Sequence, residues 1–471
     1  MMTTAGRVVG TGILVVVLAG AAYVTADAYD VVPGVVTLAA VPAQPAPFPT
    51  APGAVVPVAT TPVLTDLDPQ VPVPADAQLQ ALVDGLVADP RMGSSVGVIV
   101  QDQLTGDVLA GHLPDDGRTP ASTAKLVTAV AALSTLSPDT TLPTTVVRGE
   151  GNRIVLVGGG DMMLAAGAGD PAATEGHAGL ADLAAQTARA LQLEGVTTVS
   201  LGVDDSLFSG PRLSPAWNPA DIAAGFVAPV TALAVDTAKI TSGEYPPRYA
   251  DPSIAAATTV AQRLAEVGIT VEGTPQRADR PAGGREIGVV QSAPLDAIVH
   301  HFLDTSDNTI TEVVSRLVAI DQGLPPSFDG GAQAVLHVVD VAGVDTANAH
   351  LVDASGLGAE SVLPPSLLTG LLRLATDPTH PLLRDVATGM PIAGLTGTLA
   401  DRYTQSPARG MLRAKTGSLP HVTALSGTVL DAESRQLVFA VLADATPDGG
   451  QWGPRAAIDA FVTRVAACGC R

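Results

Sequence analysis

Ser122 and Lys125 are the first residues in this chain whose types and spacing could do chemistry. They belong to the run Pro120-Ala121-Ser122-Thr123-Ala124-Lys125, and the Ala/Leu/Val stretch that follows predicts a helix beginning at the serine. Residues three apart lie on one helix face, so the lysine amine can reach the serine hydroxyl. A lysine in a partly desolvated, cationic site can lose its proton and act as the base that activates a serine nucleophile.

The spacing alone leaves another interpretation open, because Ser-x-x-Lys also occurs at the solvated start of an ordinary helix. The use of lysine in this chain argues against it. Of the 25 Lys and Arg residues, only Lys125, Lys239 and Lys415 are lysines. Lysine can be deprotonated near neutral pH and arginine cannot. A lysine kept at this position therefore indicates chemistry.

Two further short motifs carry polar side chains suited to the same reaction. Ser306-Asp307-Asn308 follows an apolar helix predicted over 297–303; its serine could relay a proton and its asparagine could bind a substrate amide. Lys415-Thr416-Gly417-Ser418 lies on a predicted strand, where the lysine and hydroxyls could hold a carboxylate, the glycine could admit a ligand backbone, and the edge could pair with a peptide. Singly, each motif is an ordinary loop or strand end. Their order, their elements and their use of two of the three lysines together indicate a serine–lysine active site.

The elements that must position these residues are predicted from hydrophobic periodicity. We expect helices over 77–87, 180–193 and 455–467, and strands over 96–100, 108–110, 412–416, 422–430 and 437–443. A hairpin near the start and three strands near the end, with helices between them, predict one α+β domain assembled from both ends of the chain. The region from 141 to 287 would be an inserted mixed α/β region.

The N-terminal part of the chain differs in composition from the rest. Arg7 is followed by 17 uncharged residues and then by Ala26-Asp27-Ala28, which predicts a signal peptide or an uncleaved signal-anchor over 1–31. Residues 32–78 are rich in Pro, Ala, Val and Thr and are expected to form an extended spacer. The predicted catalytic domain then consists of 79–140 and 288–471, interrupted by the insertion over 141–287.

Charge and cysteine content exclude several classes of protein. The net charge of −21 argues against a nucleic-acid partner and against adsorption to anionic lipid. The two cysteines, Cys468 and Cys470, both lie at the end of the chain, so a disulfide scaffold is excluded and a frayed tail is expected there. The eight histidines show no metal-ligand spacing. We therefore expect neither a metal nor another cofactor.

Together the three motifs resemble those of penicillin-binding proteins, in particular the D-Ala-D-Ala carboxypeptidase/endopeptidase family of the DacB type. The likeness covers about residues 79 to 465 and includes five flanking stretches: 158–161 (GGGD), 204–206 (DDS), 228–233 (APVTAL), 353–357 (DASGL) and 394–399 (GLTGTL). Ala354 stands where the family often has glycine. Ser306 lies 184 positions after Ser122, space that this family fills with inserted domains. The Glu-x-x-Leu-Asn motif of class A β-lactamases does not occur between Asn308 and Lys415.

The resemblance implies a serine β-lactamase/penicillin-binding transpeptidase-like fold and a hydrolase that removes the terminal D-Ala from peptidoglycan stem peptides. Ser122 would attack the carbonyl carbon and form an acyl-enzyme, with Lys125 as its base. Ser306, assisted by Lys415, would pass a proton to the leaving D-Ala. β-Lactams would acylate Ser122 and inhibit the enzyme.

The resemblance also implies how the substrate is held. Asn308 would bind the substrate amide. Thr416 and Ser418 would bind the terminal carboxylate, and Gly417 between them would leave room for the ligand backbone. The backbone N–H groups of Ser122 and Ser418 would form an oxyanion hole.

Other functions fit parts of the same pattern. The protein could be a D,D-endopeptidase that cleaves cross-bridges, a weak β-lactamase, or a catalytically idle surface protein that binds peptidoglycan through its insertion. The intact set of motifs argues against an idle site. Either interpretation of the N-terminal segment, signal peptide or signal-anchor, exports the rest of the chain. We therefore expect the folded part on the cell-wall side of the cytoplasmic membrane, secreted or anchored through that segment.

Overall fold

The computed structural model describes residues 19–28, 32 and 68–469. The chain divides into two compact units, residues 1–66 and residues 67–471. In the first unit, residues 19–28 form a helix. Among the described residues, no helix combines the length and the hydropathy needed to cross a membrane. Residues 1–18 and 29–31 of the predicted N-terminal segment and most of the predicted spacer lie outside the described residues, so both stay predictions.

The larger unit contains a five-stranded antiparallel sheet built from both ends of the chain. Its order is β11-β12-β13-β1-β2. The strands are β1 (Val96–Asp102), β2 (Val108–His112), β11 (Leu412–Leu419), β12 (Val422–Leu430) and β13 (Gln436–Ala443). The predicted strands are therefore confirmed, and so is the α+β class. Because β1 pairs with β13, the N-terminal hairpin and the C-terminal meander form one sheet.

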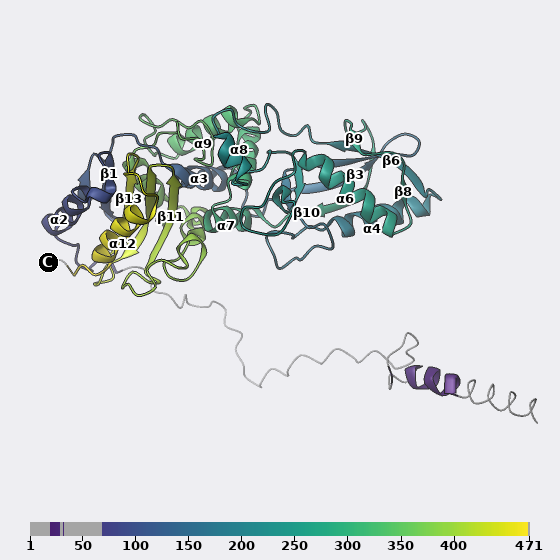
Figure 1. Ribbon diagram of the computed structural model, residues 1–471, viewed down its shortest axis with the longest axis horizontal. Coiled ribbons are helices and arrows are strands. Elements are labelled where there is room, and N and C mark those ends of the chain that lie inside the picture. Colours follow the sequence, from purple (N-terminus) through teal and green to yellow (C-terminus); the bar gives the residue numbers. More distant parts are fainter. Residues whose placement is uncertain (1–18, 29–31, 33–67, 470–471) are drawn as a thin grey trace, which may run out of the picture. The chain divides into compact units, whose positions relative to one another are not determined.

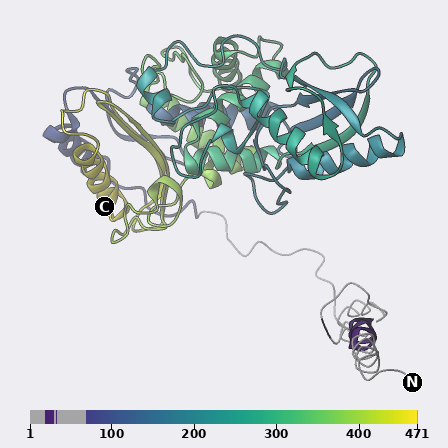
Figure 2. The same cartoon turned by 45° about the vertical axis from the view of Figure 1, so that its right-hand side comes forward.

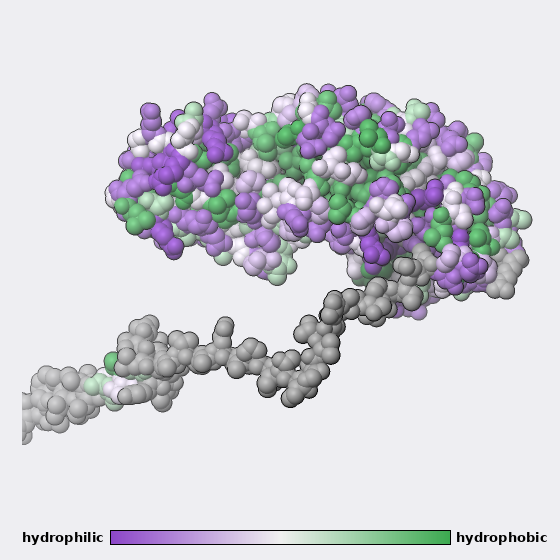
Figure 3. Space-filling view, turned by 180° about the vertical axis from the view of Figure 1, so that it is seen from behind, coloured by the Kyte–Doolittle hydropathy of each residue, from purple (hydrophilic) through white to green (hydrophobic). Residues whose placement is uncertain are grey.

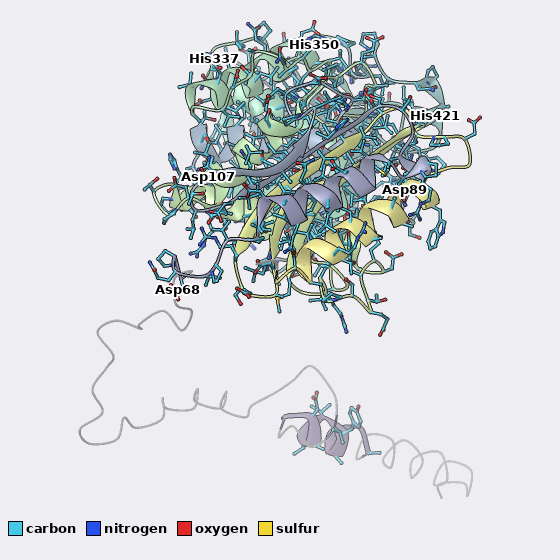
Figure 4. The ribbon with its side chains drawn as sticks, turned by 90° about the vertical axis from the view of Figure 1, so that its left-hand side faces the viewer. Asp68, Asp89, Asp107, His337, His350 and His421 are labelled. Carbon is cyan, nitrogen blue, oxygen red and sulfur yellow. The ribbon has the colours of Figure 1, made fainter. Side chains whose placement is uncertain are left out.

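The two faces of this sheet are covered by different helices (Figure 1). Side chains alternate between the faces along each strand, so on β13 Phe439 belongs to one core cluster and Val438 and Ala440 to another. α2 (Asp76–Val87) and α12 (Trp452–Ala466) cover the first face and lie side by side in Figure 4. The second face packs against a group of helices: α3 (Lys125–Thr135), α7 (Leu295–Thr305), α8 (Asn308–Asp321), α9 (Phe328–Val341), α10 (Pro365–Thr376) and α11 (Arg384–Gly389).

The insertion has its own sheet and its own core, at the right of Figure 1 and again in Figure 2. The sheet order is β10-β3-β4-β6-β8, with β9 paired to β6, and a separate two-stranded sheet joins β5 and β7. α4 and α6 pack against this sheet around Leu183, Val260 and Leu264. The bounds are β3 (Pro143–Arg148), β4 (Arg153–Gly158), β5 (Asp161–Leu164), α4 (Leu180–Leu193), β6 (Thr198–Asp204), α5 (Pro219–Ala223), β7 (Leu233–Val235), α6 (Pro252–Glu266), β8 (Thr270–Val271), β9 (Gln276–Arg277) and β10 (Arg285–Gln291).

The structure corrects three predicted features of organisation. The boundary at 287 falls inside β10, which pairs with β3 along its length, so the sheet of the insertion continues to Gln291. The spacer does not extend to 78, because α2 begins at Asp76 and the carbonyls of Pro69 and Val71 accept hydrogen bonds from Arg435. The tail is not frayed as far as Cys468, which is 5% exposed within the core cluster of α2 and α12. Cys470 lies outside the described residues.

The surface of the larger unit mixes hydrophilic and apolar residues over the face seen from behind (Figure 3). The buried core, by contrast, is almost entirely aliphatic, as expected for a chain with 3% aromatic residues. The exceptions are informative, because the buried polar side chains include both Lys125 and Lys415. Burying a charged side chain is unfavourable unless its donors are satisfied, so these two lysines mark a specialised site.

Candidate active site

Ser122 lies on a short 3₁₀ turn, Ala121–Ala124, that leads directly into α3. The predicted helix start is therefore correct in place, but its first turn is tighter than an α-helix. Ala121, the residue before the serine, has a positive φ of 46°. A non-glycine residue in this region is strained, and such strain persists only where packing fixes it. The backbone before Ser122 is therefore held in a fixed, unfavourable conformation.

Lys125 is fully buried, and its Nζ atom makes three hydrogen bonds. It lies 3.0 Å from Oγ of Ser122, 2.6 Å from Oδ1 of Asn308 and 2.8 Å from the carbonyl oxygen of Ser355. Three acceptors match the three donors of an ammonium group. When the amine is neutral, its lone pair can instead accept the Ser122 hydroxyl proton, as general-base catalysis requires.

Burial also makes the amine of Lys125 easier to deprotonate. Desolvation lowers its pKa to about 8, although the carboxylates of Asp353, Asp307 and Glu312 act in the opposite direction. An amine with a pKa near 8 is partly neutral at the pH of most cellular environments. Lys125 can therefore serve as the base without any further group to activate it.

Ser306 occupies the corner between α7 and α8. It follows the last residue of α7 and adopts a left-handed conformation, φ 63° and ψ 33°. Asp307 then caps α8, because its Oδ1 accepts a hydrogen bond from the backbone N–H of Ile310 at 2.9 Å. The cap fixes the start of α8, so that Ser306 and Asn308 on either side of Asp307 both reach the site.

Lys415 forms a second serine–lysine pair with Ser306. Its Nζ atom lies 2.9 Å from Oγ of Ser306 and 3.1 Å from the carbonyl oxygen of Thr416. Burial, together with the nearby positive charge of Lys125, holds the pKa of Lys415 well below its usual value. The two lysines repel each other in a desolvated space, so the pair favours states in which at most one of them is charged.

Asn308 and Gly417 are placed differently from the sequence-based interpretation. Besides accepting from Lys125, the Asn308 amide donates through Nδ2 to the carbonyl oxygen of Phe226 at 2.9 Å, so both of its ends are engaged by the protein. At Gly417 a Cβ atom would lie 2.6 Å from the carbonyl oxygen of Pro120. The close neighbour of this glycine is therefore the turn that carries Ser122, and not only a ligand backbone.

Thr416 and Ser418 project from β11 beside the two serine–lysine pairs. Thr416 Oγ1 lies 2.9 Å from Thr398 Oγ1, and Arg455 on α12 donates from Nη2 to Ser418 Oγ at 2.9 Å. A hydroxyl pair and a guanidinium can together bind a carboxylate. The structure thus brings all eight predicted site residues to one place, on the 3₁₀ turn Ala121–Ala124, on α3 and β11, and at the α7–α8 corner.

Three participating residues were missed by sequence reasoning. Ser355 and Thr398 lie in the stretches 353–357 and 394–399, which resemble the family but carry no recognisable chemistry of their own. Arg455 belongs to a predicted helix with no motif around it. Within residues 19–28, 32 and 68–469, no group of three or more His, Cys, Asp or Glu side chains is arranged to hold a metal ion.

The sequence is similar to those of known peptidases over most of its length. The profile of the D-Ala-D-Ala carboxypeptidase 3 (S13) family matches residues 79–247 and 244–465. A carboxypeptidase of Mycobacterium tuberculosis is 38% identical over 442 residues, covering 91% of this chain and 90% of the relative. Carboxypeptidase DacB of Mycolicibacterium smegmatis is 36% identical over 423 residues, covering 88% and 89%.

The fold is similar to a solved structure as well. The crystal structure of penicillin-binding protein 4 (DacB) from Haemophilus influenzae matches with a TM-score of 0.70 at 21% identity, covering 82% of this chain and 99% of that one. A complex of the same protein with a β-lactam matches with a TM-score of 0.62, covering 81% and 98%.

Proposed function

This chain belongs to the D-Ala-D-Ala carboxypeptidase 3 (S13) family, and from that membership and the geometry of its site we propose that it removes the terminal D-Ala of peptidoglycan stem peptides. The observation that carries the proposal is the position of Lys125, whose amine contacts both the Ser122 hydroxyl and the Asn308 amide. A buried lysine of lowered pKa beside a serine is one arrangement that activates the serine to form an acyl-enzyme.

Acylation begins with transfer of the Ser122 hydroxyl proton to the neutral amine of Lys125. The serine oxygen attacks the carbonyl carbon of the penultimate D-Ala, and the carbonyl oxygen becomes an oxyanion. We expect the N–H groups of Ser122 and Ser418 to stabilise this charge, which exists mainly in the transition state. The C–N bond then breaks, and the acyl group stays on Ser122.

The departing D-Ala amine needs a proton, and the second pair can supply it. Ser306 lies within hydrogen-bond distance of Lys415, so its hydroxyl can give a proton to the leaving nitrogen and recover one from the lysine. Water then hydrolyses the ester: its proton passes through Ser306 to Lys415, and protonated Lys125 returns a proton to the Ser122 oxygen, so both pairs are restored. Every proton in this sequence moves between protein groups, substrate and water, so the proposed reaction needs no metal or other cofactor.

The substrate is proposed to lie along β11. Its terminal carboxylate would bind the hydroxyls of Thr416 and Ser418, with the guanidinium of Arg455 supplying positive charge. Asn308 would turn one end of its amide from Phe226 or Lys125 to the substrate amide. A β-lactam carries a similar carboxylate and a reactive carbonyl, so we propose that it acylates Ser122 and inhibits the enzyme.

The proposed location is the cell-wall side of the cytoplasmic membrane, where stem peptides are found. The apolar run after Arg7 supports export, either as a signal peptide or as a membrane anchor, and the net charge of −21 argues against a nucleic-acid partner.

The deciding experiment compares the chain from residue 68 onward with its Ser122→Ala variant. Covalent labelling by a fluorescent penicillin and release of D-Ala from a stem pentapeptide should both occur, and both should be lost in the variant. Unchanged labelling of Ser122→Ala would refute the assignment. A folded wild-type protein that neither labels nor releases D-Ala, but binds peptidoglycan, would favour the idle wall-binding interpretation.

D,D-endopeptidase action on cross-bridges is a second candidate, favoured by a pocket beside the site. The pocket, of about 430 Å³, lies between α7, α11 and the start of β11. Its polar lining includes His301, Asp304, Thr396 and Arg413. Arg413 precedes Lys415 by two residues and therefore extends the proposed leaving-group side of β11. An Arg413→Met variant that loses cleavage of cross-linked dimers more than release of D-Ala would support this candidate.

A further inference from the structure

A loop of the catalytic part, residues 353–358, supports the base and the nucleophile at once. The carbonyl oxygen of Ser355 accepts a hydrogen bond from Nζ of Lys125 at 2.8 Å. At Gly356, whose φ is +74°, a Cβ atom would lie 1.9 Å from the carbonyl oxygen of Ala121. The loop therefore contacts the lysine through one residue and the strained backbone before Ser122 through the next. Any displacement of this loop would move both reacting groups.

Two fully buried carboxylates hold the backbone of the loop. Oε1 of Glu312, on α8, accepts hydrogen bonds from the N–H groups of Ala354 at 3.0 Å and Ser355 at 2.8 Å. The two oxygens of Asp353 accept from the N–H groups of Gly356 and Gly358, each at 2.7 Å. Both acidic residues are 0% exposed. Charge-assisted hydrogen bonds of this kind are short and strong, so the position of the Ser355 carbonyl is closely defined.

The two carboxylates are linked on their far side by a continuous series of contacts. Arg316, 1% exposed, lies 3.5 Å from Glu312 and places its guanidinium 4.0 Å from the ring centroid of Phe328. Phe328 meets Trp217 edge to face, with centroids 4.8 Å apart. Trp217 then donates from Nε1 to Oδ2 of Asp353 at 2.7 Å. We name Glu312, Arg316, Phe328, Trp217 and Asp353 the buried ring.

The buried ring is an unfavourable way to fill a core, which indicates a role other than stability. Removing an ion pair from water costs several kcal/mol per ion, and apolar residues of similar size often stabilise a protein as well or better. Burial and the neighbouring Asp353 raise the pKa of Glu312 to about 7. Oε2 of Glu312 and Nη2 of Arg316 have no hydrogen-bond partner. The unfavourable free energy of burying these charges is tolerated where a function needs the charged groups in fixed positions.

We propose that Glu312 and Trp217 are positioning residues for the reaction: through the loop 353–358 they set where Lys125 stands relative to Ser122. Trp217 belongs to the insertion, whereas Glu312 belongs to the catalytic helix α8. The insertion therefore takes part in aligning the base, and does more than extend the molecule. This inference rests on the proposed acylation of Ser122.

The test is the rate of acylation by a fluorescent penicillin in the chain from residue 68 onward. Trp217→Phe keeps an aromatic side chain against Phe328 but removes the indole N–H that binds Asp353. Glu312→Gln keeps an oxygen for the two loop N–H groups but removes the charge. We expect each variant to be acylated at least five-fold more slowly. The matched controls, Trp452→Phe at 83% exposure and Glu266→Gln in a surface pair with Arg263, should match the wild type.

A pH profile separates positioning from general loosening of the core. Glu312 faces Arg316 and Asp353, and Lys125 faces Asp307, Asp353, Glu312 and the charge of Lys415. Because the Glu312 carboxylate favours the protonated amine, its loss should move the midpoint of the acylation profile to lower pH. A merely structural role would lower the rate equally at every pH.

The outcomes are distinct. Wild-type rates in folded Trp217→Phe and Glu312→Gln, or an unmoved pH midpoint in Glu312→Gln, would overturn the inference. If Glu312→Gln does not fold, the double variant Glu312→Gln with Arg316→Met removes the unpaired charge and takes its place. Failure of the wild-type protein itself to be labelled would refute the proposed function instead.

Discussion

The Nζ atom of Lys125 lies 2.6 Å from Oδ1 of Asn308, although 183 positions separate the two residues in the chain. The contact joins the helix that carries the nucleophile to the corner that carries Ser306. One end of the Asn308 amide contacts Lys125 and the other contacts Phe226, so this residue holds the base in place and must release one contact to bind a substrate amide. The first prediction follows from this double engagement.

Asn308→Asp is expected to move the acylation profile to higher pH. The variant keeps the size and one oxygen of the side chain but places a negative charge beside the amine, which raises the pKa of Lys125. A shift of one pH unit would correspond to about 1.4 kcal/mol of added interaction. The measurement is the rate of penicillin acylation between pH 6 and 10. Asn348→Asp, on an exposed loop, is the control, and an equal shift in that variant would contradict the explanation.

The wild-type rate of acylation should itself increase with pH and level off near pH 8. Lys125 acts as a base only when neutral, and burial lowers its pKa to about 8, so below that value each pH unit should change the rate about ten-fold. Lys125→Arg should be inactive at every pH, because arginine stays protonated. Lys239→Arg, in a partly buried cluster with Glu175 and Asp236 away from the site, should behave as wild type. A rate independent of pH from 6 to 9 would refute this role for Lys125.

Gly417→Ala should reduce both activity and stability. Its added Cβ would lie 2.6 Å from the carbonyl oxygen of Pro120, so β11 must move away from the turn that carries Ser122. We expect a loss of about 1–3 kcal/mol in the free energy of unfolding and slower acylation. Gly85→Ala provides the comparison, since it lies in the helix α2 with open space around it. That variant should gain about 0.5–1 kcal/mol, and thermal unfolding measures both.

Arg435→Met should destabilise the fold without changing the chemistry. Arg435 makes two hydrogen bonds to the fully buried Asp102, Nη2 to Oδ1 at 2.8 Å and Nε to Oδ2 at 2.5 Å. Breaking one side of such a pair costs about 3–5 kcal/mol, because the remaining charge stays buried. Chemical denaturation gives the loss, and the pH midpoint of acylation should not move. Arg263→Met removes an exposed pair and should cost less than about 1 kcal/mol; similar losses in the two variants would contradict this account.

The sequence predicted the elements well where local pattern determines them. In the strands of the five-stranded sheet, apolar residues either alternate with polar ones or form continuous runs between turn residues. These strands occur where they were expected, as do the helix after Ser122 and the last helix, α12. The α+β class followed from the order of the predicted strands and helices, and the resemblance to the family from the three motifs and the stretches that flank them. Those features depend on residues near one another in the chain, for which periodicity and motif spacing are informative.

The features that escaped prediction depend on contacts between distant segments. The Ser355 carbonyl, the Thr398 hydroxyl and the Arg455 guanidinium reach the site from three separate elements, and each is an ordinary residue in its local context. The close neighbour of Gly417 is Pro120, from the other end of the chain. The local pattern predicted a domain boundary at residue 287, inside β10. The last residues of β10 form a strand because they pair with β3, and a local pattern does not reveal that pairing.

The pairing of β1 with β13 has a consequence for how the protein becomes active. Asp102 is the last residue of β1 and Arg435 precedes β13, and the two residues are 333 positions apart. The sheet therefore has a high contact order, and we expect the pairing of β1 with β13 to form slowly during folding. Lys415 arrives on the same late-synthesised meander. A chain emerging from synthesis can form the Ser122 turn, the insertion and most of the helices before it possesses the strand that carries Lys415. We therefore expect hydrolysis to begin only after β11–β13 have packed against the rest of the protein. Truncation before β11 should leave a partly folded protein without activity.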